Sequence, residues 1–454
     1  MERISLAEIA EHLGTVTPVQ ADITEISTDT RNLPAGCLFL ALRGKNFDGH
    51  DFVKKALEDG AIAAVTDTQI EDAPCIVVGD TGQALLDIAS LYRQKFVIPV
   101  VGITGSVGKT TTKELTACVL SQKFNTLKTA ENLNNEIGCP KTLLGLTKEH
   151  QAAVIEMGMN HFGEISRMSN CAKPTIAIIT NIGFSHVENL GSQDGILKAK
   201  LEMLEGMEEN APLITSGDDV RLAPLKETLS RPVYTFSTEG NPADVWAEDI
   251  KEENGVTTFS ICHGEKKLLA VLPAIGEHNV KNALAAYLVG VLTGMEEQEI
   301  LCGLAGYSPV GARQNILERN GQTIIEDCYN ASPASMQAAL QVLHNYPCEG
   351  RRIAVLGDML ELGDMSQELH EKVGEMAQKC NLNMLYCYGT ASQAIAQKAG
   401  EKFGVFCTDD ANVLIAKLQE YTREGDVILF KASHGMHLEN VIEAVYGQPP
   451  YGAE

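Results

Sequence analysis

The stretch GITGSVGKTTTKE (102–114) follows the apolar run VIPVVGIT (97–104) and is expected to lead into a helix. A strand, a glycine-containing turn and a helix in this order form the context that a phosphate-binding loop requires. Gly105 and Gly108 would let backbone N–H groups turn toward phosphate oxygens, and the first turn of the helix would add partial positive charge. The stretch therefore predicts a nucleotide-binding domain of the α/β class.

Two side chains after the loop fit nucleoside-triphosphate chemistry. We expect Lys109 to reach the β- and γ-phosphates and the Thr110 hydroxyl to ligate Mg²⁺. The spacing is G-x-x-G-K-T, because Ile103 stands where the full phosphate-loop pattern has its first glycine. The alternative is a chance glycine turn before a helix, which the strand–loop–helix context disfavours.

Apolar strands and helical stretches alternate beyond this loop. Strand-like runs occur at Ala152–Met157, Thr175–Ile179 and Pro212–Thr215, with helical stretches between them. Such alternation predicts a parallel sheet with helices on both faces. The run Asn282–Leu292 is apolar on nearly all sides, which predicts a buried helix.

Two further α/β units flank this region. The first has short apolar runs near Ala35–Leu42 and Ile62–Val65, and the last has a new series of strands that begins at Arg352–Leu356. The apolar pattern stops at GLAGYSP (303–309) between them. We therefore expect an α/β protein of three domains: a small mixed α/β domain over 1–82, a central phosphate-loop domain with a parallel sheet over 83–309, and a Rossmann-like α/β domain over 310–454.

Length and charge agree with this organisation. The chain has 454 residues, enough for about three domains of roughly 150 residues each. Its 60 acidic and 36 basic residues give a net charge of −24, which opposes binding to nucleic acid or to an anionic membrane surface. The start of the chain lacks the features of a secretory signal, and its apolar runs are too short to span a bilayer. Because most of its twelve cysteines stand singly, we expect free thiols and a cytoplasmic protein.

Two side chains at strand ends suggest a metal site near the loop. Glu156 ends the run AAVIEM, and His186 follows the run TIAIIT. The carboxyl ends of neighbouring parallel strands meet at one edge of a sheet, where ligands bind. Each residue alone is more typical of a capping carboxylate or a structural histidine. Together with the phosphate loop they indicate a magnesium-dependent nucleoside-triphosphate enzyme.

Several segments, taken together and in this order, resemble the Mur ligase family. Beside the phosphate loop, they are STDTRNLPAGCLFLALRGKNFDGHDFV (27–53), NLNNEIGCPKTLL (132–144), IEMGMN (155–160), TNIGFSHVENLGS (180–192), KAKLE (198–202), GEHNVKNALAA (276–286), DCYNASPASM (327–336) and GDMLELG (357–363). The resemblance covers nearly the whole chain. It is strongest to the members that add D-alanyl-D-alanine to a UDP-linked muramoyl tripeptide.

This resemblance implies an ATP- and Mg²⁺-dependent amide ligase of peptidoglycan precursor synthesis. ATP would phosphorylate the terminal carboxylate of UDP-N-acetylmuramoyl-tripeptide, and the amine of D-alanyl-D-alanine would attack the acyl phosphate to give the pentapeptide. The substrates would be small molecules, and we expect a monomer because the sequence contains no heptad pattern typical of an oligomerisation helix.

The resemblance also implies site residues. The metal would be bound by Thr110, Glu156, His186 and a carbamylated Lys200. Lys109, Glu156, His186 and Lys200 would be catalytic. Lys198 is the competing lysine, and the two would point about 200° apart on a helix. A carbamate suits this place because it presents oxygen ligands to a hard cation. The ATP-binding residues would be Gly105, Ser106, Val107, Gly108, Lys109, Thr110, Thr111, Asn282, Arg313 and Asp327.

The remaining implied residues would bind the other substrates. Asn330 and Pro333 would face the D-alanyl-D-alanine side. Arg31 suits a pyrophosphate because its guanidinium can pair two oxygens, although an ion pair with Asp29 or Asp48 is the alternative. The UDP-substrate residues would be Ser27, Asp29, Arg31, Asn46, Asp48, Gly49, His50, Asn134 and Asn135.

One segment departs from the family, and two other functions stay open. KASH (431–434) carries His434 where the family usually has an arginine, which puts the contacts of that loop in doubt because histidine is mostly neutral near pH 7. His434 and His437 alone are too few ligands for zinc. The alternatives are a related Mur-type or folylpolyglutamate-type ligase and a nucleotide-binding regulator without ligase activity.

Overall fold

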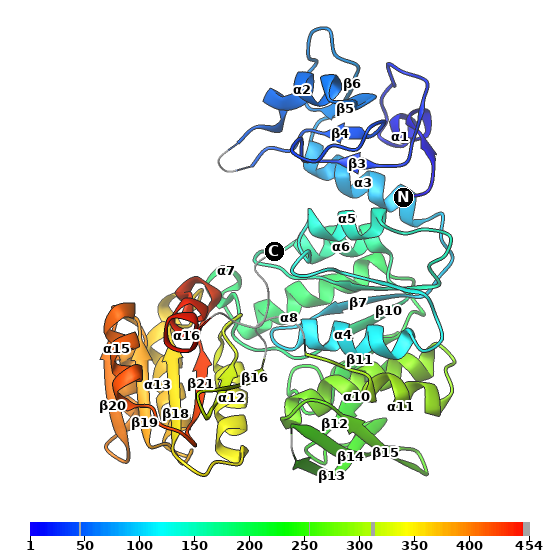
Figure 1. The fold of residues 1–454 in the computed structure, drawn as a ribbon. Helices are drawn as coiled ribbons and strands as arrows, with labels where there is room; N and C mark the ends of the chain where they lie inside the picture. The colour runs from blue at the N-terminus through cyan, green and yellow to red at the C-terminus, as the bar shows by residue number, and fades with distance from the viewer. Residues whose placement is uncertain (45–46, 254, 310–313, 448–454) are drawn as a thin grey trace.

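The computed structural model of the chain describes residues 1–44, 47–253, 255–309 and 314–447. Three α/β units follow one another along the chain, and the C-terminal unit lies beside the central one (Figure 1). The predicted α/β class is confirmed. Two predicted ligand-binding residues, Asn46 and Arg313, lie outside the described residues.

The central unit is built on a nine-stranded sheet in the order β15-β14-β13-β12-β11-β10-β7-β9-β8. Every pair from β8 to β13 is parallel, as the alternation of strands and helices predicted. The elements are β7 (Val100–Thr104), α4 (Lys109–Leu120), β8 (Thr126–Lys128), α5 (Gly138–Leu144), β9 (Ala152–Glu156), α6 (Glu164–Ala172), β10 (Ile176–Ile179), α7 (Val187–Leu190), α8 (Gln193–Leu201), η2 (Glu202–Gly206), β11 (Leu213–Ser216), α9 (Leu225–Thr228), β12 (Val233–Ser237), β13 (Val245–Glu253), β14 (Val256–His263), β15 (Lys266–Leu272), α10 (Glu277–Leu292) and α11 (Glu297–Ala305).

The antiparallel part of this sheet was not predicted. β14 pairs antiparallel with both β13 and β15, so the sheet is mixed rather than wholly parallel. These strands alternate buried and exposed residues over part of their length, as in Lys266–Leu272. Such alternation is typical of antiparallel strands with one solvated face, whereas the sequence analysis relied on continuous apolar runs.

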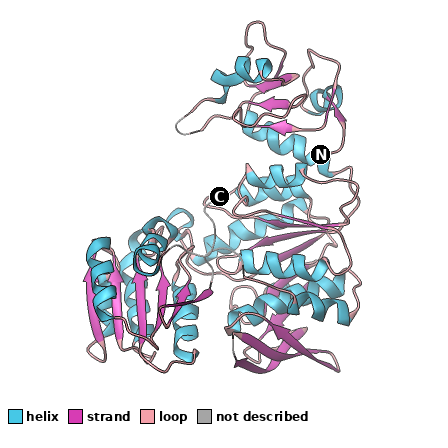
Figure 2. Cartoon of the chain, viewed as in Figure 1, coloured by secondary structure: helices cyan, strands magenta, loops and turns pink. Residues whose placement is uncertain are grey.

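Helices cover both faces of the central sheet (Figure 2). The side chains of β7 point to these two faces and pack in two separate cores. Val101 and Ile103 pack in one core with residues of α4, α10 and α11, and Val100 packs in the other core with residues of α3 (Thr81–Arg93), α5 and α6. The predicted burial of helix α10 is confirmed, since every residue from Asn282 to Gly290 is buried.

The N-terminal unit carries a four-stranded parallel sheet in the order β3-β4-β5-β6 and a small antiparallel pair, β1–β2. The predicted boundary near residue 83 falls in the first turn of α3, which contacts α1 and also α5 and α6 of the central unit. The boundary therefore stays a prediction. The elements are β1 (Ile4–Ser5), α1 (Leu6–His12), β2 (Asp22–Ile23), β3 (Ile26–Ser27), β4 (Leu38–Leu40), η1 (Gly49–Phe52), α2 (Val53–Glu58), β5 (Ala63–Thr66) and β6 (Cys75–Val77).

The C-terminal unit has a six-stranded sheet in the order β16-β17-β21-β18-β19-β20, parallel except for β16–β17. β18 matches the predicted run Arg352–Leu356, whereas β16, β17 and the edge strand β20 were not predicted. The elements are β16 (Asn315–Arg319), β17 (Gln322–Glu326), α12 (Pro333–Asn345), β18 (Arg352–Gly357), η3 (Gly363–Met365), α13 (Ser366–Ala377), β19 (Met384–Tyr388), α14 (Gln393–Ala399), β20 (Gly404–Thr408), α15 (Ala411–Tyr421), β21 (Val427–Lys431), η4 (His434–Met436) and α16 (Leu438–Tyr446).

None of the helices in the described parts of the chain is both long and apolar enough to cross a membrane.

The close contact between α11 and α4 should be sensitive to one added methyl group. A Cβ at Gly303 would lie 2.5 Å from Val119 Cα and 2.9 Å from Cys118 O, so the two backbones would have to separate. Gly303→Ala should therefore lower the free energy of unfolding by about 1–3 kcal/mol in urea denaturation. The control is Gly306→Ala, whose nearest contact would be 3.3 Å. Equal stability of the two variants would contradict this packing.

Candidate active site

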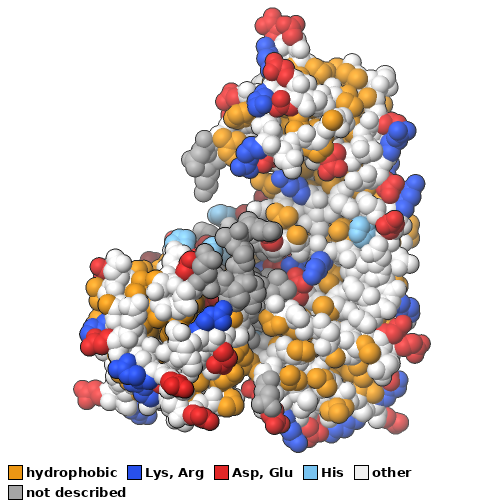
Figure 3. Space-filling view, viewed as in Figure 1, with side chains coloured by type: hydrophobic (Ala, Val, Ile, Leu, Met, Phe, Trp, Pro, Cys, Tyr) orange, Lys and Arg blue, Asp and Glu red, His pale blue; other side chains and the backbone are white. Residues whose placement is uncertain are grey.

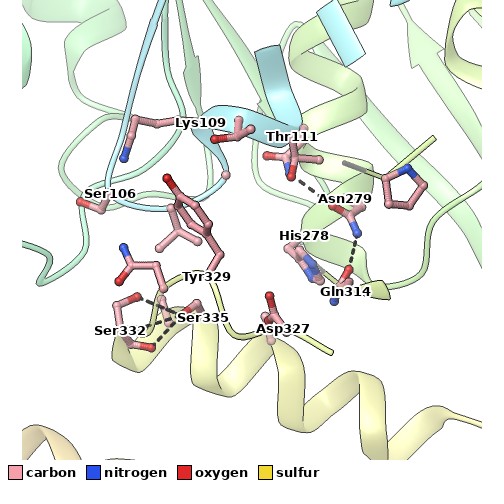
Figure 4. A pocket seen from close by; sticks show the side chains of 18 of the residues that line it. Ser106, Lys109, Thr111, His278, Asn279, Gln314, Asp327, Tyr329, Ser332 and Ser335 are labelled. Carbon is pink, nitrogen blue, oxygen red and sulfur yellow. Dashed lines mark hydrogen bonds between the residues drawn. The ribbon is translucent and has the colours of Figure 1, made fainter. Parts of the chain in front are cut away.

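A cleft of about 790 Å³ lies between the phosphate loop of the central unit and the start of α12 in the C-terminal unit. Figure 4 shows Ser106, Lys109 and Thr111 on one side, Asp327, Ser332 and Ser335 on the opposite side, and His278 and Asn279 at one end. The predicted loop and the predicted DCYNASP segment, which are far apart in the sequence, therefore face each other.

The loop after β7 is held by the residues that follow β10. Thr180 Oγ1 donates to Val107 O at 2.6 Å, and Asn181 Nδ2 donates to the same oxygen at 2.9 Å. In return, the Val107 N–H donates to Asn181 Oδ1 at 3.0 Å. A Cβ at Gly105, where φ is +155°, would lie 1.8 Å from Thr180 Oγ1. Only glycine fits there, and the loop has a defined shape without a ligand.

The end of this loop is suited to an anion. Gly108 adopts a left-handed conformation (φ +85°) as the N-cap of α4, and no side chain caps the helix. The first backbone N–H groups of a helix make no intrahelical hydrogen bond, so the start of α4 is suited to donate to phosphate oxygens. Lys109 Nζ donates to Gly105 O at 3.0 Å, so its ammonium group lies over the loop.

Glu156 lies at the end of β9 and faces the same loop. Its Oε1 accepts hydrogen bonds from Thr110 Oγ1 at 3.2 Å and from Asn134 Nδ2 at 2.8 Å. Its Oε2 is buried and accepts no hydrogen bond from any described residue, although Lys113 Nζ lies 3.8 Å away. A divalent cation would satisfy this oxygen.

This donor set fits Mg²⁺. The ion commonly binds one or two carboxylates and completes its shell with waters and substrate phosphates, so Glu156 and the Thr110 hydroxyl beside a phosphate loop suffice. Asn134, predicted to bind the UDP substrate, lines the cleft and contacts this carboxylate. Asn135 also lines the cleft, and its Oδ1 accepts from Ile137 N and Gly138 N at the start of α5.

The two lysines of the KAKLE segment have opposite environments. Lys198 is exposed and lies over the ring of Phe162, whereas Lys200 is buried. Burial, with a smaller effect from the charge of Lys109, holds the pKa of Lys200 well below its ordinary value. The neutral amine is the form that reacts with carbon dioxide, so Lys200 is the better candidate for carbamylation. Lys200 is not among the residues that line the cleft.

The side of the cleft formed by α10 contains the predicted Asn282, and also Asn279 and His278, which the sequence analysis did not assign. Asn282 accepts from Thr112 Oγ1 at 3.1 Å and lies against Gly108, which agrees with a place beside the nucleotide. One turn earlier, Asn279 Nδ2 donates to Gln314 Oε1 at 2.8 Å. Desolvation lowers the pKa of His278 to about 4, so its ring is neutral near pH 7. The segment GEHNVKNALAA (276–286), which contains His278 and Asn279, was the only feature of the sequence that pointed to them.

The C-terminal unit contributes an ion pair between the buried Lys431 and the partly buried Asp327 to the cleft. Lys431 Nζ donates to Asp327 Oδ2 at 2.6 Å and to Asn330 O at 3.1 Å. Asp327 and Asn330 both line the cleft, whereas Pro333 begins α12 and does not. Lys431 was not assigned from the sequence because its contact with Asp327 joins two distant segments.

His434, which departs from the family pattern, lies next to the side of the cleft that contains Asp327 and Lys431. Its exposed ring stacks on Tyr329 with 5.8 Å between the centroids, and Tyr329 lines the cleft. His437 lies 5.9 Å from His434, ring to ring. Across the described parts of the chain, no cluster of three histidine, cysteine, aspartate or glutamate side chains is arranged to hold a metal.

The predicted UDP-binding residues that the structure describes in the N-terminal unit are not part of the cleft lining. Arg31 pairs with Asp29 at 2.6 Å on the surface, which was the alternative considered for it. Ser27 Oγ donates to the carbonyl of Asp29 at 2.9 Å. Asp48 accepts from the backbone N–H of His50 at 2.9 Å and lies 2.6 Å from its ring Nδ1.

Gly49 belongs to the same small site and is held closely by the backbone. Its N–H donates to Leu42 O at 2.8 Å, and a Cβ would lie 2.6 Å from that oxygen. These contacts fix the shape of this segment, and its binding of the UDP-linked substrate stays a prediction.

The chain matches known proteins over its whole length. Three family models match it: "Mur ligase family, catalytic domain" over residues 22–100, "Mur ligase middle domain" over 103–290, and "Mur ligase, glutamate ligase domain" over 312–434. It is 38% identical over 461 residues to UDP-N-acetylmuramoyl-tripeptide–D-alanyl-D-alanine ligase of Bacillus subtilis, covering 99% of this chain and 100% of that protein.

Solved structures show the same fold. A crystal structure of MurF from Acinetobacter baumannii has a TM-score of 0.90 and 33% identity, covering 98% of this chain and 99% of that one. MurF ligase from Thermotoga maritima in complex with ADP has a TM-score of 0.85 and 30% identity, covering 93% and 96%.

The buried His278 ring predicts a pH dependence of stability. Its folded pKa of about 4 lies below the ordinary 6.5, so the unfolded chain binds the proton more tightly. The free energy of unfolding should therefore be undiminished above pH 6.5 and should fall by about 1–3 kcal/mol between pH 6.5 and pH 4. His278→Gln should remove this part of the fall. Parallel profiles for the variant and the wild type, measured by urea denaturation, would refute it.

Proposed function

The chain belongs to the Mur ligase family, and we propose that it joins D-alanyl-D-alanine to UDP-N-acetylmuramoyl-tripeptide at the expense of ATP. The product would be the UDP-linked muramoyl pentapeptide of peptidoglycan synthesis. One observation carries the proposal: the phosphate loop of the central unit and the Asp327–Lys431 wall of the C-terminal unit line one cleft. ATP and an amine substrate held by separate units can meet there.

The reaction proceeds in two steps. The carboxylate of the tripeptide attacks the γ-phosphorus of ATP, which gives an acyl phosphate and ADP. The amine of D-alanyl-D-alanine then attacks the acyl carbon, loses a proton and expels phosphate. A cleft lined by two units suits this chemistry, because the acyl phosphate must be kept from water until the amine arrives.

Lys109 and the first turn of α4 bind the phosphates. Their positive charge is directed at the transferred group, where negative charge must be stabilised. Thr110, Glu156, His186 and carbamylated Lys200 would hold Mg²⁺, which would reduce the repulsion between the triphosphate and the carboxylate. Asn134 and Thr110 orient Glu156 through its Oε1. Asn282, Asp327 and Arg313 contact the nucleotide.

The other substrates bind at the two flanking units. The uridine nucleotide binds at Arg31 and the Asp48–His50 turn of the N-terminal unit, with Asn135 near the sugar. D-alanyl-D-alanine binds beside Asn330 at the start of α12. The three domains are those of residues 1–82, 83–309 and 310–454.

The protein works on small molecules, as a monomer in the cytoplasm. Its net charge of −24 opposes attraction to nucleic acid or anionic lipid. On the face shown in Figure 3, the described basic side chains are interspersed with acidic ones. The cationic groups that the reaction needs are instead placed locally, as Lys109 and Lys431 are in the cleft.

Reconstitution tests the function. Purified protein with ATP, Mg²⁺, UDP-N-acetylmuramoyl-tripeptide and D-alanyl-D-alanine should form pentapeptide, and phosphate release should require both acceptor and dipeptide. Lys109→Ala should lower turnover at least about 100-fold, because it removes a cation from the transferred group. Lys123→Ala, three residues beyond the end of α4, is the control. Absence of pentapeptide, or ligation of another amine in its place, would refute the assignment.

Lys198 and Lys200, both in α8, allow a matched test of the proposed carbamate. Lys200→Ala should lose most activity and regain part of it when short carboxylates such as formate or acetate are added, because they restore an oxygen ligand. Lys198→Ala should keep the wild-type rate. Mass spectrometry of gently handled protein should find a carbon dioxide adduct on Lys200. Full activity of Lys200→Ala would remove this residue from the site.

A further inference from the structure

His186 and Glu361 meet across the boundary between the central and C-terminal units. His186 directly precedes α7, and Glu361 lies in the loop between β18 and η3. His186 Nδ1 lies 2.6 Å from Glu361 Oε2. The nitrogen is withdrawn from solvent, and the Glu361 carboxylate lies within hydrogen-bonding distance of it, although the angle is not ideal. None of the roles assigned above uses Glu361.

Both residues are held in an unusual backbone conformation. Each has φ of +62°, in the left-handed region that residues other than glycine seldom adopt. Non-glycine residues persist there only where the surrounding structure holds them, and such residues cluster at functional sites. The two loops that face each other therefore have defined shapes.

Neighbouring contacts hold the two loops together. A Cβ at Gly363, where φ is +51°, would lie 3.2 Å from the side chain of Glu188 in α7. On the other side of the contact, Lys372 Nζ lies 5.8 Å from the ring centroid of Phe184. The His186–Glu361 pair is thus part of a continuous interface between the units.

The position of the pair relates it to the cleft. His186 lines the cleft together with Ser106 and Glu156, whereas Glu361 does not line it. The two ring nitrogens of histidine point in different directions, and a carboxylate at Nδ1 favours the tautomer with its proton there. Nε2 then keeps its lone pair for a ligand in the cleft. Histidines that bind metals are commonly oriented by such a carboxylate.

We infer that Glu361 is a positioning residue that orients His186 across the interface, so that His186 is set for the metal–nucleotide complex only when the two units are in contact. The inference rests on the proposed metal role of His186. It connects domain contact with metal binding through one carboxylate. A site completed in this way would activate ATP only after the C-terminal unit has covered the cleft, which limits loss of the acyl phosphate to water.

Mn²⁺ binding tests the inference without ligation. Binding of Mn²⁺ to each variant is measured by electron paramagnetic resonance in the presence of ADP. Glu361→Ala should weaken Mn²⁺ binding about 10-fold, the size of effect typical of a carboxylate that orients a metal-binding histidine. Glu361→Gln should fall between Glu361→Ala and the wild type, because its amide oxygen can still accept from Nδ1. The exposed Asp364→Asn, three residues along the chain, is the control and should bind as the wild type does.

A double-mutant cycle shows whether Glu361 acts through His186. In the His186→Ala background, Glu361→Ala should cause no further loss of Mn²⁺ binding. An equal loss in both backgrounds would show that Glu361 acts elsewhere and would overturn the inference. Unchanged or tighter Mn²⁺ binding by Glu361→Ala would also overturn it, because the contact would then be irrelevant or obstructive. Glu361 is 54% exposed, so these variants should fold, which thermal unfolding checks.

The readout separates this inference from the proposed function. A wild-type protein that shows the predicted Mn²⁺ coupling but forms no pentapeptide would refute the proposed function and leave the role of Glu361 intact. A protein that forms pentapeptide while Glu361→Ala binds Mn²⁺ normally would refute only the inference.

Discussion

The hydrogen bonds from Thr180 and Asn181 to the loop after β7 are the constraint on which the site depends. They fix Val107 and leave the N-terminus of α4 open toward the cleft. An anion-binding loop with a preset shape needs no reorganisation when the ligand arrives, which is the condition for effective electrostatic stabilisation. The parallel pairing of β7 with β10 creates this contact, because it brings the ends of both strands to one edge of the sheet.

The same edge brings together the charges of the site. Glu156 ends β9, the other neighbour of β7, and its buried carboxylate faces the helix that begins at the loop. Lys109 lies over the loop, and Lys431 approaches from the C-terminal unit. A protein with a net charge of −24 therefore concentrates cations where two anionic reactants must meet. The third unit matters because it supplies one wall of the cleft.

The parts of this arrangement that depend on local pattern could be predicted from the sequence. Continuous apolar runs identified β7, β9 and β10, and the all-apolar run at Asn282–Leu292 identified the buried helix α10. The strands of the antiparallel extension were missed because their periodicity reflects a solvated face. The approach of the phosphate loop to the DCYNASP segment could not be deduced from either segment, because it depends on how two units pack. His278 and the His186–Glu361 contact were missed for the same reason.

The central claim is that the terminal phosphates of ATP and a divalent cation bind where the loop after β7 meets Glu156. A crystal structure with a non-hydrolysable ATP analogue and Mg²⁺ tests it most directly. The account predicts β- and γ-phosphates on the backbone of Gly108–Thr110, with the metal bound to Glu156 Oε2. A nucleotide bound elsewhere, or a metal that leaves that oxygen without a partner, would contradict it.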